Sequence, residues 1–216
     1  MEQVTDTFLT VSGSAESQFV EQRSRFISFI WHVTDSEQVK KRLAAVQKEY
    51  YDARHVCYAY MLGAERKDWR ANDNGEPSGT AGKPILGQIN SAGLTDVLIA
   101  VVRYFGGVKL GTSGLTEAYR QAAVQVIGKA DVITAHVERN VTVLFTYSMT
   151  NVVMKTVKEL DVGIVEQDYG VFSAEGVDST FDCKMVLRAR LSVADELSYR
   201  LETVADTQAV RELMII

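Results

Sequence analysis

The feature that most constrains this chain is a strand-like run joined to a helix-like pattern by a segment rich in glycine. Residues 97–102 form a short continuous apolar run with many β-branched residues, which predicts a strand buried on both faces. From Leu115 to about Lys129, apolar residues recur at helical spacing and predict an amphipathic helix. Glycine lets another group approach the backbone closely, and a helix N-terminus binds anions through its unpaired N–H groups. We therefore expect a phosphate-contacting surface at this junction.

The candidate anion-binding surface consists of residues in and around the junction. The set contains four cations, four glycines with backbone donors, and one aromatic side chain that could stack on an unpaired base. Its members are Lys83, Arg103, Lys109, Arg120, Gly106, Gly107, Gly111, Gly114 and Tyr104. Phe105 could stack in the same way. The opposing interpretation is that the glycines only make tight turns, that Phe105 is core, and that the charges pair with Asp73, Glu76 or Glu117. The residues alone favour the two interpretations equally.

Two familiar nucleotide-binding motifs are excluded. Gly82-Lys83 is part of a segment that resembles a P-loop, but Pro77 and Pro84 occupy the places where that motif needs glycine and a hydroxyl residue. The glycine spacing between Gly106 and Gly114 does not match the dinucleotide fingerprint. Any anion site here must therefore be of a looser kind.

Three segments resemble a known family. Residues 52–57 read DARHVC, residues 74–84 read NGEPSGTAGKP, and residues 102–111 read VRYFGGVKLG. In this order they resemble the signature segments of the IMPACT family, which includes the YigZ-like proteins, and the general plan of the chain agrees over nearly its full length. The resemblance implies action near translation and nucleic acid. Eukaryotic members regulate translation through a protein partner, but they carry an additional N-terminal domain not seen in this sequence, so that partner is not implied.

The order of predicted elements indicates two domains, over residues 1–134 and 138–216. The second follows the ferredoxin-like β-α-β-β-α-β pattern, with elements at 140–147, 151–160, 162–169, 181–191, 193–205 and 210–216. In the first, strands are expected at 8–11, 25–33, 55–62 and 97–102. One helix is expected to follow Ser36, which would be its cap, and two more are expected at 85–89 and 115–129. A turn-rich loop covers 68–84. The lack of strict alternation predicts the α+β class. The family resemblance implies that this domain is an α/β sandwich like the second domain of a small-subunit ribosomal protein.

Charge is distributed unevenly along the chain, whose formal net charge is -5. Residues 1–135 carry 15 Lys and Arg and 15 Asp and Glu, whereas residues 136–216 carry 8 and 13. Because general nucleic-acid binders are usually basic, any such contact here must be a local patch on the N-terminal part. The acidic C-terminal domain could instead hold a protein partner. No apolar run approaches the roughly 20 residues that span a bilayer, and no signal-peptide pattern is visible, so we expect a cytoplasmic protein without a membrane partner.

Catalysis is a weaker alternative. Arg54, His55, Asp73 and Glu76 form a possible functional loop, in which the imidazole and the carboxyl groups could act as general acid and base on a phosphoester. However, no spacing of a nucleophile and its base is visible, and a histidine on a strand is more often a hydrogen-bonded core residue.

The same sequence gives no sign of a metal site or a cofactor. Cys57 and Cys183 are expected to be buried free thiols, and no Cys/His pair has zinc spacing. We therefore expect a protein that binds RNA or a ribosomal surface and is linked to the regulation of translation. A protein-interaction module and a phosphoester-acting enzyme stay as alternatives.

Overall fold

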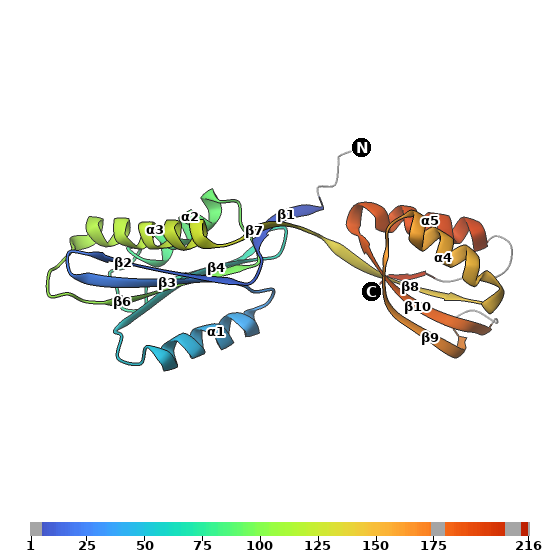
Figure 1. Cartoon of the computed structure of the whole chain (residues 1–216), viewed down its shortest axis with the longest axis horizontal. Helices are drawn as coiled ribbons and strands as arrows, with labels where there is room; N and C mark the ends of the chain where they lie inside the picture. Colours follow the sequence, from blue (N-terminus) through green and yellow to red (C-terminus); the bar gives the residue numbers. More distant parts are fainter. Residues whose placement is uncertain (1–5, 174–179, 206–212, 216) are drawn as a thin grey trace. The chain divides into compact units, whose positions relative to one another are not determined.

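We describe the fold from a computed structural model of the 216-residue chain. The structure describes residues 6–173, 180–205 and 213–215. They fall into two compact units: an N-terminal unit, Phe8–Ala135, and a C-terminal unit of the described residues from His136 onward together with Asp6 and Thr7. Each unit has its own sheet, its own helices and its own apolar core (Figure 1). The α+β class is therefore confirmed.

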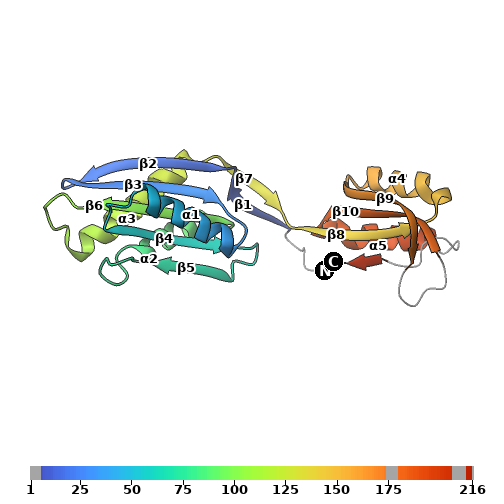
Figure 2. The same ribbon diagram turned by 90° about the horizontal axis from the view of Figure 1, so that it is seen from below.

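The N-terminal unit is a five-stranded antiparallel sheet between two helical layers. The strands lie in the order β2 (Ser14–Glu21), β3 (Ser24–His32), β6 (Val97–Tyr104), β4 (His55–Leu62) and β5 (Asp68–Asn72). Helices α2 (Gly82–Ser91) and α3 (Gly111–Lys129) cover one face of this sheet, and α1 (Ser36–Glu49) covers the other (Figures 1 and 2). A separate pair is formed by β1 (Thr7–Val11) and β7 (Val132–His136).

Strand β6 lies at the centre of the sheet because both of its faces are apolar. Ile99 and Val101 belong to the core beneath α2 and α3, whereas Leu98 and Ala100 pack with residues of α1. All of these side chains are fully buried. The continuous apolar run thus confirms the predicted strand buried on both faces.

Helix α1 shows how local sequence sets an element's start. Asp35 is its N-cap, and the carboxylate accepts hydrogen bonds from the backbone N–H groups of Glu37 and Gln38, both at 2.8 Å. The prediction that Ser36 caps this helix is therefore wrong by one residue. Both residue types favour the cap position, but the carboxylate of Asp35 binds two of the free N–H groups.

Two edge strands have no counterpart among the predicted elements. β2 and β5 are the outer strands of the sheet, and much of each is exposed. Because neither shows a clear alternation of apolar and polar residues, period-two analysis does not detect them. β5 and α2 occupy both ends of the segment predicted as one long loop, so the connection itself shortens to residues 73–81.

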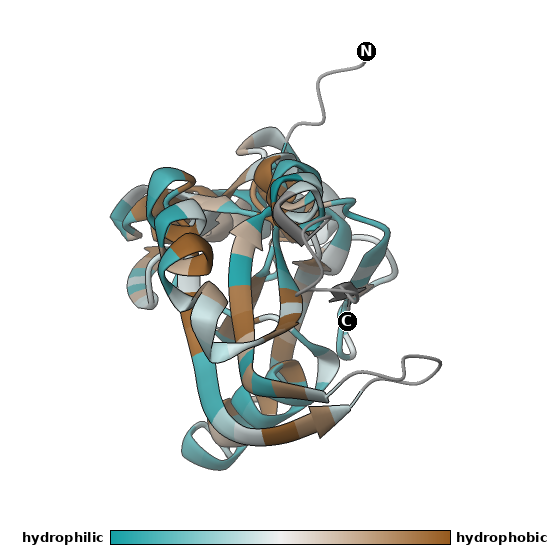
Figure 3. Ribbon diagram, turned by 90° about the vertical axis from the view of Figure 1, so that its right-hand side faces the viewer, coloured by the Kyte–Doolittle hydropathy of each residue, from teal (hydrophilic) through white to brown (hydrophobic). Residues whose placement is uncertain are grey.

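The C-terminal unit has the predicted ferredoxin-like topology. Its described elements are β8 (Glu138–Phe145), the short 3-10 helix η1 (Tyr147–Met149), α4 (Thr150–Glu159), β9 (Gly163–Ser173), β10 (Thr180–Arg190), α5 (Leu191–Ala205) and β11 (Leu213–Ile215). The antiparallel sheet has the order β11-β8-β10-β9, and both helices lie on one face (Figure 1). Figure 3 shows hydrophobic and hydrophilic bands along the ribbons, and in β10 buried residues alternate with more exposed ones. Of the predicted last strand, residues 210–212 and 216 lie outside the described residues.

No helix among the described residues is long and apolar enough to cross a bilayer. The two cysteines are buried and free, as the sequence predicts.

Candidate nucleic-acid interface

The register of the sheet brings two functional candidates together at one end of β6. Arg103 lies opposite Phe26 of β3 on one side and opposite His55 of β4 on the other. Residues directly opposite in neighbouring strands point to the same face, so these three side chains share the face that α2 and α3 cover. Distant positions in the sequence thus become neighbours through strand pairing.

The loop over residues 73–81 is folded around the carboxylate of Asp73. This carboxylate accepts hydrogen bonds from the backbone N–H groups of Gly79, Ala81 and Gly82, at 2.8, 3.0 and 2.8 Å. Burial raises the pKa of Asp73, but the three N–H donors outweigh burial and hold the pKa below its ordinary value of 3.8. Asp73 therefore closes the loop and satisfies the first N–H groups of α2, whose cap residue offers no side-chain bond.

Gly82 lets this loop sit against β5. A Cβ atom at this position would lie 2.4 Å from the backbone nitrogen of Asn72. Any side chain would therefore push the start of α2 away from the strand.

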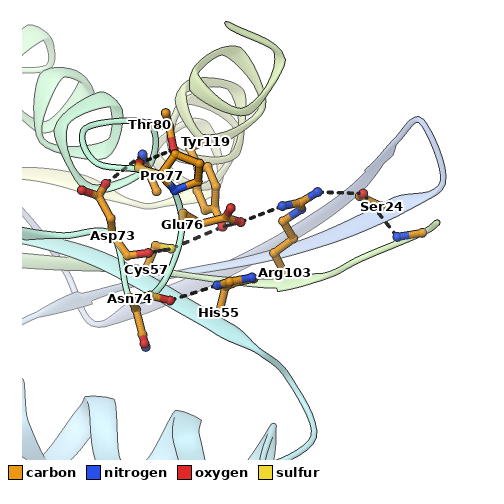
Figure 4. A network of polar contacts seen from close by, with 12 residues as sticks. Ser24, His55, Cys57, Asp73, Asn74, Glu76, Pro77, Thr80, Arg103 and Tyr119 are labelled. Atoms are coloured by element: carbon orange, nitrogen blue, oxygen red, sulfur yellow. Dashed lines mark hydrogen bonds and ion pairs between the residues drawn. The ribbon is translucent and has the colours of Figure 1, made fainter. Parts of the chain in front are cut away.

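A buried ion pair lies beneath the loop. Arg103 Nη1 lies 2.8 Å from Glu76 Oε1, and the two side chains are only 7% and 3% exposed. Tyr119 of α3 donates a hydrogen bond to the same carboxylate oxygen at 2.9 Å, and Arg103 Nη2 donates to Ser24 Oγ at 3.4 Å (Figure 4). The network joins β6, the loop, α3 and the first residue of β3. One of the opposing interpretations drawn from the sequence, an Arg103–Glu76 pair, is thus present.

Cys57 belongs to the same network but is not prepared for nucleophilic chemistry. Its Sγ lies 2.9 Å from the carbonyl oxygen of Asp73 and 3.3 Å from Tyr119 Oη, and its single hydrogen can be donated to either oxygen. Burial raises the pKa of the Cys57 thiol to about 12, and burial also raises the pKa of Tyr119. Both groups stay protonated near neutral pH, so they act here as hydrogen-bond donors that fix the loop.

His55 stands at the edge of this network with one ring nitrogen engaged. Nδ1 lies 2.9 Å from the carbonyl oxygen of Asn74, which can only accept, so this nitrogen carries the hydrogen. The other ring nitrogen points away from Asn74 (Figure 4). Gly75 lies beside the ring: a Cβ atom at this position would lie 3.4 Å from Nδ1.

A hollow of about 330 Å³ opens beside the ion pair. Its walls come from the start of β4, the loop over residues 73–81, the end of β6 and the start of α3. The lining residues are Arg54, His55, Glu76, Pro77, Arg103, Phe105, Lys109, Leu110, Gly111, Thr112 and Leu115. The hollow therefore collects residues from all three segments that carry the family resemblance.

The structure brings together only part of the predicted anion-binding set. Arg103, Lys109 and Gly111 line the hollow, and so do Arg54, His55 and Glu76 of the possible functional loop. Asp73 lies beneath the loop as its anchor.

Tyr104 is separated from that set. It follows Arg103 in a strand, so its side chain points to the opposite face, where it donates a hydrogen bond to Asp52 at 2.6 Å. The guanidinium of Arg25 lies 4.6 Å from the Tyr104 ring centroid.

Two of the predicted cations lie on the two helices rather than in the hollow. Arg120 is hydrogen-bonded and ion-paired to Glu117 on the exposed surface of α3. Lys83 is exposed in the first turn of α2.

The remaining predicted glycines have structural tasks. A Cβ atom on Gly106 would lie 2.0 Å from the backbone of Arg23, so glycine is required by close approach. Gly107 and Gly111 have φ values of +87° and +71°, which favour glycine by conformation. A Cβ on Gly114 would lie 3.2 Å from Leu110 Cβ.

The turn between β2 and β3 contributes residues that the sequence did not indicate. Arg23 is exposed in the turn and Arg25 is exposed near the start of β3, and Ser24 between them is buried against Arg103. Gln22 and Arg23 have φ values of 44° and 66° although neither is glycine, so the usual sequence signal of a hairpin turn is absent. Only the sheet register reveals that this turn lies beside the end of β6.

Comparison with known proteins supports the family resemblance. Residues 22–127 match the Impact N-terminal domain. The chain is 33% identical over 153 residues to the IMPACT family member YigZ of Escherichia coli, covering 70% of this chain and 75% of that protein. It is 35% identical over 127 residues to the IMPACT family member YvyE of Bacillus subtilis, covering 59% of this chain and 58% of the relative.

A solved structure agrees over both units. The crystal structure of a hypothetical protein matches with a TM-score of 0.72 and 26% identity, covering 99% of this chain and 98% of the other. The Bacillus subtilis match spans little more than half of that relative's length, so what the whole relatives do is not transferred here. Together with the three sequence segments, the match to the Escherichia coli protein is decisive: the chain belongs to the IMPACT family.

Proposed function

We propose that this chain binds RNA, in connection with the regulation of translation, and that RNA contacts one end of the N-terminal unit. The single observation that carries the proposal is a set of exposed cations from three segments at the same end of the sheet. Arg54 and Lys109 line the hollow, Arg23 lies against Gly106, and Arg25 lies over Tyr104 on the opposite face. We call this set the basic end; its members are Arg23, Arg25, Arg54 and Lys109.

Of two acids in this region, Glu76 is neutralised by a buried cation, whereas Asp52 keeps its negative charge beside Tyr104. Glu76 is buried and is shared by Arg103 and Tyr119. Asp52 accepts a hydrogen bond from Tyr104. Because none of the ion pairs among the described residues involves a member of the basic end, its charge is available to phosphate groups. Lys83 and Arg120 would act as outer contacts.

An aromatic side chain completes the surface. Phe105 is 52% exposed, and the Arg103 guanidinium lies 5.6 Å from its ring centroid. An exposed ring of this kind stacks on unpaired bases in many single-strand binders. The family resemblance implies action near translation, which favours RNA over DNA as the nucleic acid.

The test is RNA binding across a salt series with matched charge variants. Arg54→Ala with Lys109→Ala removes two cations of the basic end, and Lys40→Ala with Lys41→Ala removes two exposed cations of α1 as the control. We expect the first variant to bind single-stranded RNA about tenfold more weakly at low salt and to show a salt slope smaller by about 0.7 for each lost phosphate contact. Equal affinity of both variants and the unchanged chain would refute the basic end as the RNA surface.

A second candidate function rests on the C-terminal unit. β9 is an outer strand of its sheet, and Ile164, Val165, Tyr169 and Val171 on it are 43–83% exposed. An outer strand presents backbone N–H and C=O groups to which an extended segment of another protein can pair. This supports a protein partner for the acidic C-terminal domain.

Co-sedimentation with purified ribosomes separates the two candidates. If RNA contacts dominate, the Arg54/Lys109 variant loses the ribosome and Val171→Lys keeps it. The reverse pattern would support a protein partner on β9 and contradict RNA binding as the main contact.

A further inference from the structure

The start of α3 is left open where it meets the hollow. Its first turn has no side-chain cap and no acidic residue, although Gly111 and Thr112 line the hollow there. The start of α1, in contrast, is closed by Asp35. Free N–H groups and the positive end of a long helix dipole attract an anion when nothing in the chain occupies them.

A second, independent observation indicates a missing partner at the same place. Arg103 is 6% exposed, and its Nε is buried without a hydrogen-bond partner among the described residues. Buried polar atoms are nearly always paired in folded proteins, so an unpaired nitrogen calls for an explanation. Arg103 lines the same hollow as Gly111 and Thr112 at the start of α3.

The other lining groups match an anion in charge. Lys109 and Arg54 add two exposed cations to the lining. The single acid in the lining, Glu76, is neutralised by Arg103. A carboxylate that is already paired and hydrogen-bonded opposes a bound anion far less than a free one.

The size of the hollow limits the ligand. About 330 Å³ lies at the lower end of small-molecule sites and suits a group of mononucleotide size. Exposed Phe105 in its wall can stack on one base. A phosphate monoester carries up to two negative charges and three acceptor oxygens, which suits a site with cations and several N–H donors better than the single charge of a phosphodiester.

We propose that the hollow is a binding subsite for a phosphate monoester, held at the start of α3 with its nucleoside base on Phe105. The inference rests on the proposed RNA function and sharpens it: the chain recognises the phosphorylated end of an RNA strand. A free mononucleotide presents the same chemistry, and the experiment must distinguish the two sources.

The test compares RNA ends at constant sequence. Fluorescent single-stranded RNA oligomers carrying a 5′-phosphate, a 3′-phosphate or only hydroxyl ends are titrated with the full chain, and adenosine 5′-monophosphate is added as a competitor. We expect the RNA with one of the two phosphorylated ends to bind about tenfold more tightly than the RNA with hydroxyl ends. A difference of this size corresponds to one additional charge-assisted hydrogen bond. We also expect the mononucleotide to remove this difference at concentrations that leave the hydroxyl-ended RNA bound.

A charge variant locates the effect at the helix start. Thr112→Glu places a carboxylate at the open turn, and Gln121→Glu adds the same charge at an exposed position farther along α3. Circular dichroism checks that both fold. Thr112→Glu should abolish the preference for the phosphorylated end, whereas Gln121→Glu should keep it.

The outcomes separate this inference from the proposed function. RNA binding with equal affinity for all ends overturns the subsite and leaves RNA binding intact. Tight binding of the mononucleotide without any RNA binding supports the subsite chemistry and overturns RNA as its source. A preference that survives Thr112→Glu also overturns the assignment to α3.

Discussion

The two units differ in whether they bury an ion pair among the described residues. In the N-terminal unit, Arg103 and Glu76 are buried together, with side chains 7% and 3% exposed. In the C-terminal unit, every ion pair among the described residues keeps at least 33% of each side chain exposed. Burying a pair removes two ions from water, and an apolar replacement is often at least as stable. The ferredoxin-like unit shows that a sheet and two helices pack without such a pair, so the buried pair is best understood as positioning the wall of the hollow.

The first and largest prediction tests this contrast directly. Glu76→Ala leaves the Arg103 charge buried and unpaired, and we expect it to lower the free energy of unfolding of the N-terminal unit by about 3–5 kcal/mol. Glu196→Ala removes an exposed partner of Arg200 in the C-terminal unit, and we expect a loss below about 0.5 kcal/mol.

Denaturant unfolding measures both effects in the full chain. Both tryptophans, Trp31 and Trp69, lie in the N-terminal unit, so their fluorescence follows that unit alone. Far-UV circular dichroism follows both units. Similar losses in the two variants would contradict the view that only the N-terminal unit depends on a buried charge.

The second prediction concerns the close approach of Gly106 to the backbone of Arg23. Gly106→Ala would place Cβ 2.0 Å from the backbone of Arg23, and we expect a loss of at least about 2 kcal/mol by overpacking. At Gly170 in β9, the nearest atom to a Cβ is Phe172 Cζ at 3.6 Å, an ordinary contact. Gly170→Ala should therefore change stability by less than about 0.5 kcal/mol. If Gly106→Ala unfolds reversibly at the same denaturant midpoint as the unchanged chain, the close approach of Gly106 to the backbone of Arg23 is contradicted.

The comparison also explains what sequence could reveal. β6 was predictable from its continuous apolar run, and α3 was predictable from apolar residues at helical spacing. The C-terminal unit was predictable because the patterns of six elements follow at regular spacing. β2 and β5 were not, because exposed edge strands lack that alternation.

Sequence patterns also predicted only some of the residues in the candidate site. His55, Arg103 and Lys109 were indicated by their motifs, and the structure places all three at one hollow. Arg23 and Arg25 were not indicated, because their nearness to β6 depends on a register across 79 residues. That Tyr104 faces away from Arg103 follows from strand alternation once β6 is known to extend to Tyr104.

The third prediction uses pH to separate the units. The backbone donors hold the pKa of Asp73 below 3.8, despite burial, so its ionised form stabilises the folded N-terminal unit. This stabilisation is complete above pH 3.8 and is lost as the pH falls through the lower folded-state pKa. We expect Asp73→Asn to destabilise the N-terminal unit by about 1–2 kcal/mol at neutral pH, comparable to a lost cap, and to reduce its loss of stability in acid. Tryptophan fluorescence at pH 7 and at pH 3 provides the measurement; an unchanged acid sensitivity in the variant would exclude Asp73 as its source.

The last and smallest prediction concerns the first turns of helices, because the proposed phosphate subsite lies at the start of α3. Asp35→Ala removes the acceptor of two N–H groups of α1, and we expect a loss of about 1 kcal/mol in the N-terminal unit. Ser36→Ala is the matched control and should change little, because the side chain of Asp35 is the cap. A measurable penalty at α1 means that free donors at a helix start carry a free-energy cost in this fold, so the open start of α3 is a feature that a ligand can relieve. If Asp35→Ala is as stable as the control, water satisfies such donors equally well, and the uncapped start of α3 no longer distinguishes a binding site from an ordinary helix end.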